Sequence, residues 1–344
     1  MKGSKKKFWL LSMIAVVMFT TILAGCGSKP SDESGGTTAN ESSLRVGLVT
    51  DLGSVNDKSF NQSAWEGLQQ LNKDTGVEVK YLEPKKDTEL ETSLNQFVKD
   101  KYDLTWATGF TMMDHVQKVA AANPDSKMGI VDAAVDLPNV ASVLFKEHEG
   151  SFLVGVIAGK MTKTNKIGFV GGMENDVIIR FEAGFRAGVA AVNPDAVVED
   201  IYVGDFNSVD KGKNAAATHY NQGADIVFHA AGQAGNGVFN EATERKKNGS
   251  EVWVIGVDKD QSLEFGDEIT LTSMIKRVDQ AVLTVSKQLV DGNFPGGTTT
   301  LLGLKEKGVD IAETSNKNVP ADVLTLVDEY REKIISGEIT VPEK

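Results

Sequence analysis

Cysteine and histidine are scarce in this chain. Its 344 residues include one cysteine, Cys26, and four histidines. A single thiol cannot close an intramolecular disulfide, and no second cysteine is present to help bind a metal. No two histidines stand at the HxxxH spacing of metal-binding helices. The sequence therefore predicts neither a disulfide framework nor a metal site, and we expect no cofactor.

An excess of positive charge is also missing. The chain carries 36 Lys and Arg against 48 Asp and Glu, for a net charge of −12. A nucleic-acid-binding protein needs a basic face to neutralise phosphates, so this balance argues against a nucleic-acid partner. Aromatic residues make up only 7% of the chain, which argues against a long track of stacked bases.

Motifs of catalysis and of phosphate binding are absent too. "GFVGGMEND" (168–176) lacks the Gly-Lys-Ser/Thr of a P-loop and the GxGxxG spacing of a dinucleotide fold. "DKDQSLEFGDE" (258–268) lacks the glycine order of a calcium-binding EF-hand, and no GxSxG elbow occurs. We therefore predict that the protein is not an enzyme.

The N-terminus has the pattern of a targeting segment. Four lysines among residues 2–7 precede the apolar stretch "FWLLSMIAVVMFTTILAG" (8–25), and Cys26 follows "LAG". This resembles the bacterial lipobox, in which residues 1–25 would be removed as a signal peptide and the Cys26 thiol lipidated. Cleavage would remove four of the 36 basic residues and take the net charge to −16. Alternative interpretations are an uncleaved anchor helix, or a secretory signal with an incidental cysteine.

Residues 26–43 are rich in Ser, Gly, Thr and Asn and have no apolar period. Such a segment buries too little surface to offset its ordering entropy, so we predict a flexible tether. We expect a folded body that is lipid-anchored at the extracytoplasmic face of the cell membrane, without spanning it.

From residue 44 onward, short apolar runs alternate with amphipathic stretches. A first series predicts strands at 45–50, 77–83, 102–109, 127–132 and 140–145, with helices at 59–73, 89–100 and 112–122. A second series predicts strands at 166–172, 198–204, 224–231, 251–258 and 268–274, with helices at 180–192, 209–221, 235–248 and 278–291. Strands that alternate with helices indicate βαβ units, so we predict an α/β fold with two parallel-sheet lobes.

Polar and aromatic residues recur where these strands end. The carboxyl ends of parallel strands face the ligand in open α/β sheets, so these residues are predicted to share one cleft. They include Asp51, Phe60, Asn61, Asp132, Phe181, Phe206, Gly232, Asp258 and Lys276.

Each of these positions also has a purely structural interpretation. Phe60 would pack under its own helix, and Asp57 or Ser59 would cap that helix. Phe181 has the i, i+4 spacing of a core residue, Asp258 would cap a turn, and Lys276 would be a surface lysine. The convergence of several positions on one cleft favours the functional interpretation.

Several segments together resemble the basic membrane protein family of bacterial surface lipoproteins, and in particular its purine-nucleoside-binding branch. They are "SVNDKSFNQSAWEG" (54–67), "GFVGG" (168–172), "FEAGFRAG" (181–188), "YVGDFN" (202–207), "DIVFHAAGQAGNGV" (225–238), "VIGVDKDQ" (254–261) and "TSMIKRVDQAV" (272–282). These segments are spread over nearly the whole chain after the tether.

The resemblance implies a periplasmic-binding-protein type I fold, with two Rossmann-like lobes joined by three crossover segments. One lobe would comprise residues 44–146 plus about 276–305, and the other residues 147–275 plus about 306–344. The protein would be a monomeric substrate-binding lipoprotein that delivers a nucleoside to an ABC permease in the membrane.

The resemblance also assigns roles to the residues of the predicted cleft. Phe60 would stack on one face of the base, and Phe206, with Phe181 as the alternative, would cover the other. Asn61 and Asp132 would bind the base edge, whereas Asp258 and Lys276 would hold ribose hydroxyls. Asp51 and Gly232 would line the same cleft.

Other functions stay open at this point. A protein of the same fold would bind a sugar or another small molecule, and a surface adhesin or regulatory lipoprotein would need no ligand in the cleft. An exported nucleoside hydrolase or phosphorylase would need an aspartate metal cluster or a phosphate-binding nest, and the sequence shows neither spacing.

Overall fold

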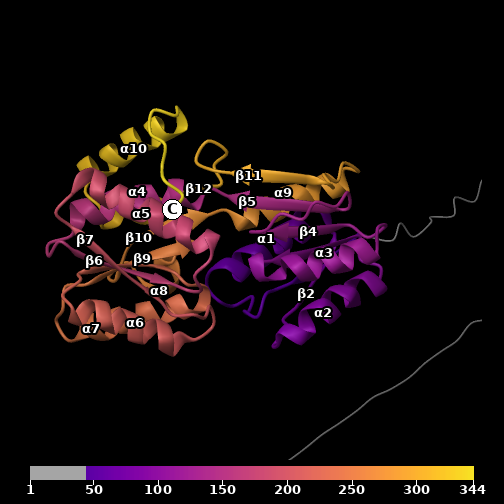
Figure 1. Cartoon of the computed structure of the whole chain (residues 1–344), viewed down its shortest axis with the longest axis horizontal. Helices are drawn as coiled ribbons and strands as arrows, with labels where there is room; N and C mark the ends of the chain where they lie inside the picture. The colour runs from indigo at the N-terminus through magenta and orange to yellow at the C-terminus, as the bar shows by residue number, and fades with distance from the viewer. Residues whose placement is uncertain (1–43) are drawn as a thin grey trace, which may run out of the picture. The chain divides into compact units, whose positions relative to one another are not determined.

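The computed structural model describes residues 44–344 (Figure 1). The predicted signal peptide (1–25), Cys26 and the tether that ends at residue 43 lie outside the described residues. The described part contains two six-stranded sheets, in the orders β11-β5-β4-β3-β1-β2 and β12-β10-β9-β8-β6-β7. The predicted α/β fold with two parallel-sheet lobes is confirmed.

The first sheet is entirely parallel. Its strands are β1 (Arg45–Val49), β2 (Glu78–Leu82), β3 (Leu104–Thr108), β4 (Met128–Val131), β5 (Val140–Phe145) and β11 (Thr298–Leu302). Helices α1 (Phe60–Thr75) and α9 (Val278–Val290) contact each other, as do α2 (Asp87–Lys99) and α3 (Met113–Ala122). The inner strands β3 and β4 are buried along their whole length, which explains why they appear in the sequence as short unbroken apolar runs.

The second sheet is parallel except for its edge strand β12, which runs antiparallel to β10. Its strands are β6 (Lys166–Gly171), β7 (Val197–Tyr202), β8 (Ile226–Ala230), β9 (Trp253–Asp258), β10 (Thr270–Lys276) and β12 (Val309–Ile311). Its helices are α4 (Glu147–Met161), α5 (Asp176–Val192), α6 (Val209–Asn221), α7 (Gly235–Lys247), α8 (Ser262–Phe265) and α10 (Ala321–Ile335). Figure 1 shows α4 and α5 on one side of this sheet and α6 and α7 on the other.

The alternating pattern did not reveal α4, α8, α10, β11 or β12. Helix α4 is buried on all sides over most of its length, so it has no polar face that would create a helical period. It packs on α5 through glycines, because a Cβ on Gly184 or Gly188 would collide with the backbone of His148 or Phe152. Two helices can approach so closely only where the residue at the contact is a glycine, which has no Cβ.

The chain passes between the two sheets three times, from β5 to α4, from β10 to α9 and from β11 to β12. The first two passages are short: residue 146 lies between β5 and α4, and residue 277 between β10 and α9. Within residues 44–344, no helix combines the length and the hydropathy needed to cross a bilayer.

Candidate functional site

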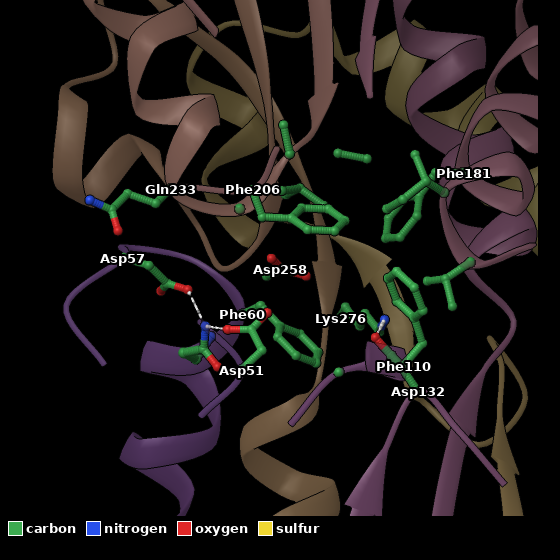
Figure 2. A pocket seen from close by; sticks show the side chains of 18 of the residues that line it. Asp51, Asp57, Phe60, Phe110, Asp132, Phe181, Phe206, Gln233, Asp258 and Lys276 are labelled. Atoms are coloured by element: carbon green, nitrogen blue, oxygen red, sulfur yellow. Dashed lines mark hydrogen bonds and ion pairs between the residues drawn. The ribbon is translucent and has the colours of Figure 1, made fainter. Parts of the chain in front are cut away.

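A pocket lies between the two sheets, where the carboxyl ends of their strands face each other (Figure 2). All nine residues predicted from the strand ends line it: Asp51, Phe60, Asn61, Asp132, Phe181, Phe206, Gly232, Asp258 and Lys276. The walls also include residues that were not selected as site candidates: Asp57, Gly109, Phe110, Val177, Ile178, Asn207, Ala230, Ala231, Gln233 and Val257. Val177 and Ile178 belong to the first turn of α5, which the sequence pattern placed too late in the chain.

Two phenylalanines face the pocket from opposite sides. Phe60 is the first residue of α1 in the first lobe, whereas Phe206 follows β7 in the second (Figure 2). Phe206 lies against Gly172, where any Cβ would collide with its ring. Phe110 meets Phe206 edge to face, with ring centroids 6.3 Å apart, and Phe181 is almost fully buried. A flat group between Phe60 and Phe206 would contact an aromatic ring on each face.

Asp132 and Asp258 have the same backbone conformation at the ends of their strands. Their φ angles are 67° and 65°, a left-handed region that costs a residue other than glycine about 1–3 kcal/mol. Asp258 accepts a hydrogen bond from Ser59 Oγ of the other lobe. Asp132 Oδ2 accepts one from Lys276 Nζ at 2.7 Å, whereas its buried Oδ1 has no partner among the described residues. That oxygen is free to accept from a ligand.

Lys276 is a buried cation. Its side chain is 1% exposed, and its Nζ lies 2.7 Å from Asp132 Oδ2 and 3.0 Å from Glu147 Oε1. The Nζ also lies 5.1 Å from the ring centroid of Phe145, 5.2 Å from that of Phe60 and 5.5 Å from that of Phe181, so three rings add cation–π attraction. Burial opposes the charge, but the neighbouring carboxylates outweigh it and raise the pKa of Lys276. The interpretation of Lys276 as a surface lysine is wrong.

Glu147 is the other partner of Lys276, and nothing in the sequence pattern pointed to it. It is fully buried at the start of α4, and its Oε2 accepts a hydrogen bond from Arg180 Nε at 2.7 Å. Burial alone would raise the pKa of Glu147, but Lys276 and Arg180 outweigh burial and lower it. Glu147 is the first residue of α4, which the sequence pattern did not predict, so no pattern marked it as a site residue.

Asn61 uses both N–H groups of its amide within the protein. Its Nδ2 donates to Asp51 Oδ1 at 3.0 Å and to Asp57 Oδ2 at 3.2 Å, and its Oδ1 accepts from Thr108 Oγ1 at 2.7 Å. Asn61 therefore connects the first two carboxylates of the pocket to β3. It orients these acceptors, and donating to a base edge would require it to exchange one of its two donated bonds, whereas Oδ1 has a second lone pair that can accept.

Asp57 combines two roles. Its carboxylate accepts the backbone N–H groups of Ser59, Asn61 and Gln62, so it caps α1, while its side chain also lines the pocket. Burial raises the pKa of Asp57 to about 7, although these hydrogen bonds favour the ionised form. The capping interpretation is correct, but it misses the second role.

Polar contacts connect the two lobes beside the pocket. Asn236 Nδ2 donates to the backbone oxygen of Asp57 at 3.2 Å, and Gln261 Nε2 donates to that of Lys58 at 2.9 Å. Lys259 Nζ lies 2.6 Å from Glu66 Oε1 on α1. The loop before α1 thus rests against the second lobe.

No group of three or more His, Cys, Asp and Glu side chains within residues 44–344 is arranged to hold a metal ion. His219 and His229 are packed in the second lobe, where they contact the Phe169 carbonyl and the Gln261 side chain. Burial lowers the pKa of His229 to about 4, which keeps it neutral.

Comparison with known proteins agrees with this arrangement. A family model described as ABC transporter substrate-binding protein PnrA-like matches residues 44–344. The chain is 44% identical to a CD4+ T-cell-stimulating antigen of Listeria innocua serovar 6a, over 99% of either protein. It is 40% identical to the ABC transporter nucleoside-binding protein BmpA of Lactococcus lactis subsp. cremoris, over 99% of this chain and 100% of that protein.

Among solved structures, an ABC transporter system solute-binding protein from Aeropyrum pernix K1 superposes with a TM-score of 0.81 at 30% identity. The match covers 88% of this chain and 94% of that one. The fold is the periplasmic-binding-protein type I fold that the family resemblance implied. The chain therefore belongs to the PnrA-like family of ABC transporter substrate-binding proteins, which is also called the basic membrane protein family.

Proposed function

We propose that this protein binds a purine nucleoside in the pocket between its lobes and delivers it unchanged to an ABC permease. The observation that carries the proposal is the pair Phe60 and Phe206, which face each other from different lobes across a pocket rich in hydrogen-bond acceptors. The Lactococcus lactis relative bears the name nucleoside-binding protein. A nucleoside has the matching parts: a flat base and a ring of hydroxyl donors.

The base would lie between Phe60 and Phe206. Stacking of a base on an aromatic side chain contributes about 1–3 kcal/mol per contact. Asp132 Oδ1, buried and without a partner, would accept an N–H group of the base edge. A ligand without that N–H would leave the carboxylate unpaired, at a cost of about 1–3 kcal/mol.

The ribose would lie toward Asp258 and Lys276. A carboxylate can accept hydrogen bonds from two neighbouring hydroxyls, and an ionised acceptor makes each bond stronger. Four aspartates and only one lysine line the pocket, so it favours a neutral ligand with many donors over a phosphate.

The export signal extends the proposal beyond the described residues. Cleavage before Cys26 and lipidation of its thiol would anchor the protein, as a monomer, to the outer face of the cell membrane. Mass spectrometry of the protein from its native membrane should show Cys26 as the acylated N-terminus, and Cys26→Ser should release the protein into the medium.

The ligand is tested by calorimetry with inosine, guanosine, adenosine and ribose. Because a co-purified ligand would mask binding, the protein is first unfolded, dialysed and refolded, and native mass spectrometry checks that it is empty. We expect at least one purine nucleoside to bind and ribose alone to bind far more weakly. A protein that binds ribose as tightly as inosine would be a sugar receptor, and one that binds neither would contradict the proposal. Incubation with inosine should release no free hypoxanthine.

A further inference from the structure

Glu147 is a buried charge that does not line the pocket. It lies at the junction where the chain passes from β5 into α4, and its side chain is 0% exposed. A carboxylate at that depth is costly unless it is paired. Both of its oxygens lie within ion-pair distance of a cation, Lys276 Nζ at 3.0 Å from Oε1 and Arg180 Nε at 2.7 Å from Oε2, although only Oε2 accepts a hydrogen bond among the described residues.

These contacts extend to the pocket wall. Lys276, at the end of β10, holds Glu147 on one side and Asp132 Oδ2 on the other. The four side chains therefore form a row of alternating charge: Arg180, Glu147, Lys276 and Asp132. Two members of the row stand at passages between the lobes, and only its far end, Arg180, is partly exposed, at 18% of its side chain.

We propose that Glu147 is a positioning residue for the ligand: it holds the Lys276 ammonium against the pocket and keeps Asp132 available as an acceptor, without touching the ligand itself. The inference rests on the proposed function, because Lys276 and Asp132 are its ligand-contacting groups. It assigns a binding role to a residue that the pocket walls do not include.

The reason is a division of charge. With Glu147 present, the Lys276 ammonium is shared between two carboxylates, so Asp132 keeps part of its negative charge for a ligand donor. Without the charge of Glu147, Lys276 would be drawn to Asp132 alone, and Arg180 would lose its anionic partner. Asp132 would then be a weaker acceptor and Lys276 a more loosely placed donor.

The charged groups around Asp132 give the expected pH dependence. Burial raises the pKa of Asp132 to about 6, Lys276 lowers it, and Glu147 and Asp258 raise it. Arg180 also interacts with Asp132 and would lower its pKa. Because a donor-rich ligand needs the ionised carboxylate, affinity should fall as pH drops through this pKa. Removing Glu147 should move that fall to lower pH, and removing Arg180 should move it to higher pH.

The experiment measures inosine affinity by calorimetry from pH 5 to pH 8 in the wild-type protein, Glu147→Gln and Arg180→Gln. At pH 7.5 we expect Glu147→Gln to bind about tenfold more weakly, which is within the coupling range of residues in one network. The acid fall in affinity should shift in opposite directions in the two variants. If Glu147 and Arg180 only supported the fold, both variants would bind inosine more weakly, but the pH at which affinity falls would not move in opposite directions.

Glu241→Gln is the matched control. The side chain of Glu241 is 11% exposed, against 0% for Glu147, and its Oε1 lies 2.7 Å from Arg245 Nε on α7, so it forms a largely buried Glu–Arg pair outside the pocket. Its affinity for inosine and its pH profile should equal those of the wild type. Thermal unfolding of every variant shows whether it is folded. If Glu147→Gln is not folded, Arg180→Gln still tests the inference, because its acid fall in affinity should move to higher pH.

Two results would overturn the inference and leave the proposed function intact. One is a wild-type affinity and pH profile in Glu147→Gln, and the other is an acid fall in affinity that moves in the same direction in both variants. If the wild-type protein binds no nucleoside at any pH, the proposed function fails and the inference fails with it. The two failures are distinguished by the wild-type titration.

Discussion

Asp132 and Asp258 stand on equivalent strands of the two sheets. β4 and β9 are each the third strand in their sheet, and each aspartate is held at a φ near +65°. The strain is repeated at both pocket walls, where it turns a carboxylate from each lobe toward the same space. Ser59 holds Asp258 from across the pocket, while Lys276 holds Asp132.

Phe60→Ala and Phe206→Ala should each weaken nucleoside binding by about 1–3 kcal/mol, because each removes one stacking surface. Calorimetry with inosine measures the loss, and thermal unfolding should show little change. Phe294→Ala is the control, because Phe294 packs in a separate depression near Pro138 and should change stability but not affinity. If Phe60→Ala and Phe206→Ala bound inosine as tightly as the control Phe294→Ala, Phe60 and Phe206 would not stack on the ligand.

The four pocket aspartates should make acidification stabilising for the ligand-free protein between pH 8 and pH 5. Burial raises the pKa of all four, to about 7 for Asp57 and about 6 for Asp132, so at these groups the folded state binds protons that the unfolded state does not. The buried histidines act in the opposite direction: burial lowers the pKa of His148, His219 and His229, to about 4 for His229, so the unfolded state binds their protons first. The contribution of one aspartate is therefore measured as a difference between the wild type and a variant.

Asp57→Asn keeps an acceptor for the first turn of α1 and removes the titrating group. On going from pH 8 to pH 5, its melting temperature should rise less, or fall more, than that of the wild type, because both proteins share the contribution of the histidines. Carboxyls with a lowered pKa, such as Glu83, add pH dependence only near and below their ordinary value of 4.5. Equal changes of melting temperature in the wild type and in Asp57→Asn would contradict this account.

At the scale of elements, α1 and the loop before it contact α7 and the segment after β9 of the other lobe. These contacts use the backbone oxygens of Asp57 and Lys58 and the ion pair between Lys259 and Glu66. None of them involves a ligand, so they stabilise this arrangement of the two lobes by protein contacts alone.

Reversing one charge of the Lys259–Glu66 pair should weaken ligand binding, because the arrangement of the two lobes around the pocket then contains a like-charge contact. Lys259→Glu or Glu66→Lys should bind inosine several-fold more weakly, within the ~0.2–1 kcal/mol typical of partly exposed pairs. The double reversal should restore affinity, as measured by calorimetry at low and high salt. The Lys287–Asp74 pair, which joins α9 to α1 within one lobe, is the control.

At the scale of the whole molecule, net charge and pocket charge have the same sign. The chain has a net charge of −12, and four aspartates line the pocket beside a single lysine. A phosphorylated ligand would add negative charge beside these aspartates, three of which are buried, and repulsion between buried charges is weakly screened.

Inosine should therefore bind at least about 100-fold more tightly than its 5′-monophosphate, a difference of about 2.7 kcal/mol. Competition calorimetry measures the ratio, and raising the salt concentration should narrow it only slightly if the repulsion is inside the pocket. Comparable affinities would mean that the pocket opens to solvent at the ribose end.

The residues that follow each strand predicted the pocket, because parallel sheets bring the carboxyl ends of their strands to one edge whatever the packing details. This pattern identified Asp132, Asp258 and Lys276 without showing that Lys276 pairs with Asp132. It missed Glu147 and Arg180 as partners, because their contact depends on how α4 and α5 pack, and α4 has no polar face to reveal it. The lobe boundaries drawn near residues 146, 276 and 305 stay a prediction.

The sequence by itself determined the family, the two parallel-sheet lobes and nine of the residues that line the cleft. The family follows from the resemblance of seven segments, whereas the lobes and the nine residues follow from apolar periods and from what stands after each strand. Only the tertiary structure decided which of these groups are paired: both N–H groups of the Asn61 amide are used, Asp132 keeps one free oxygen, and Lys276 lies between two carboxylates. Such pairing depends on distances of a few ångströms between residues up to 144 positions apart, and no local pattern encodes them.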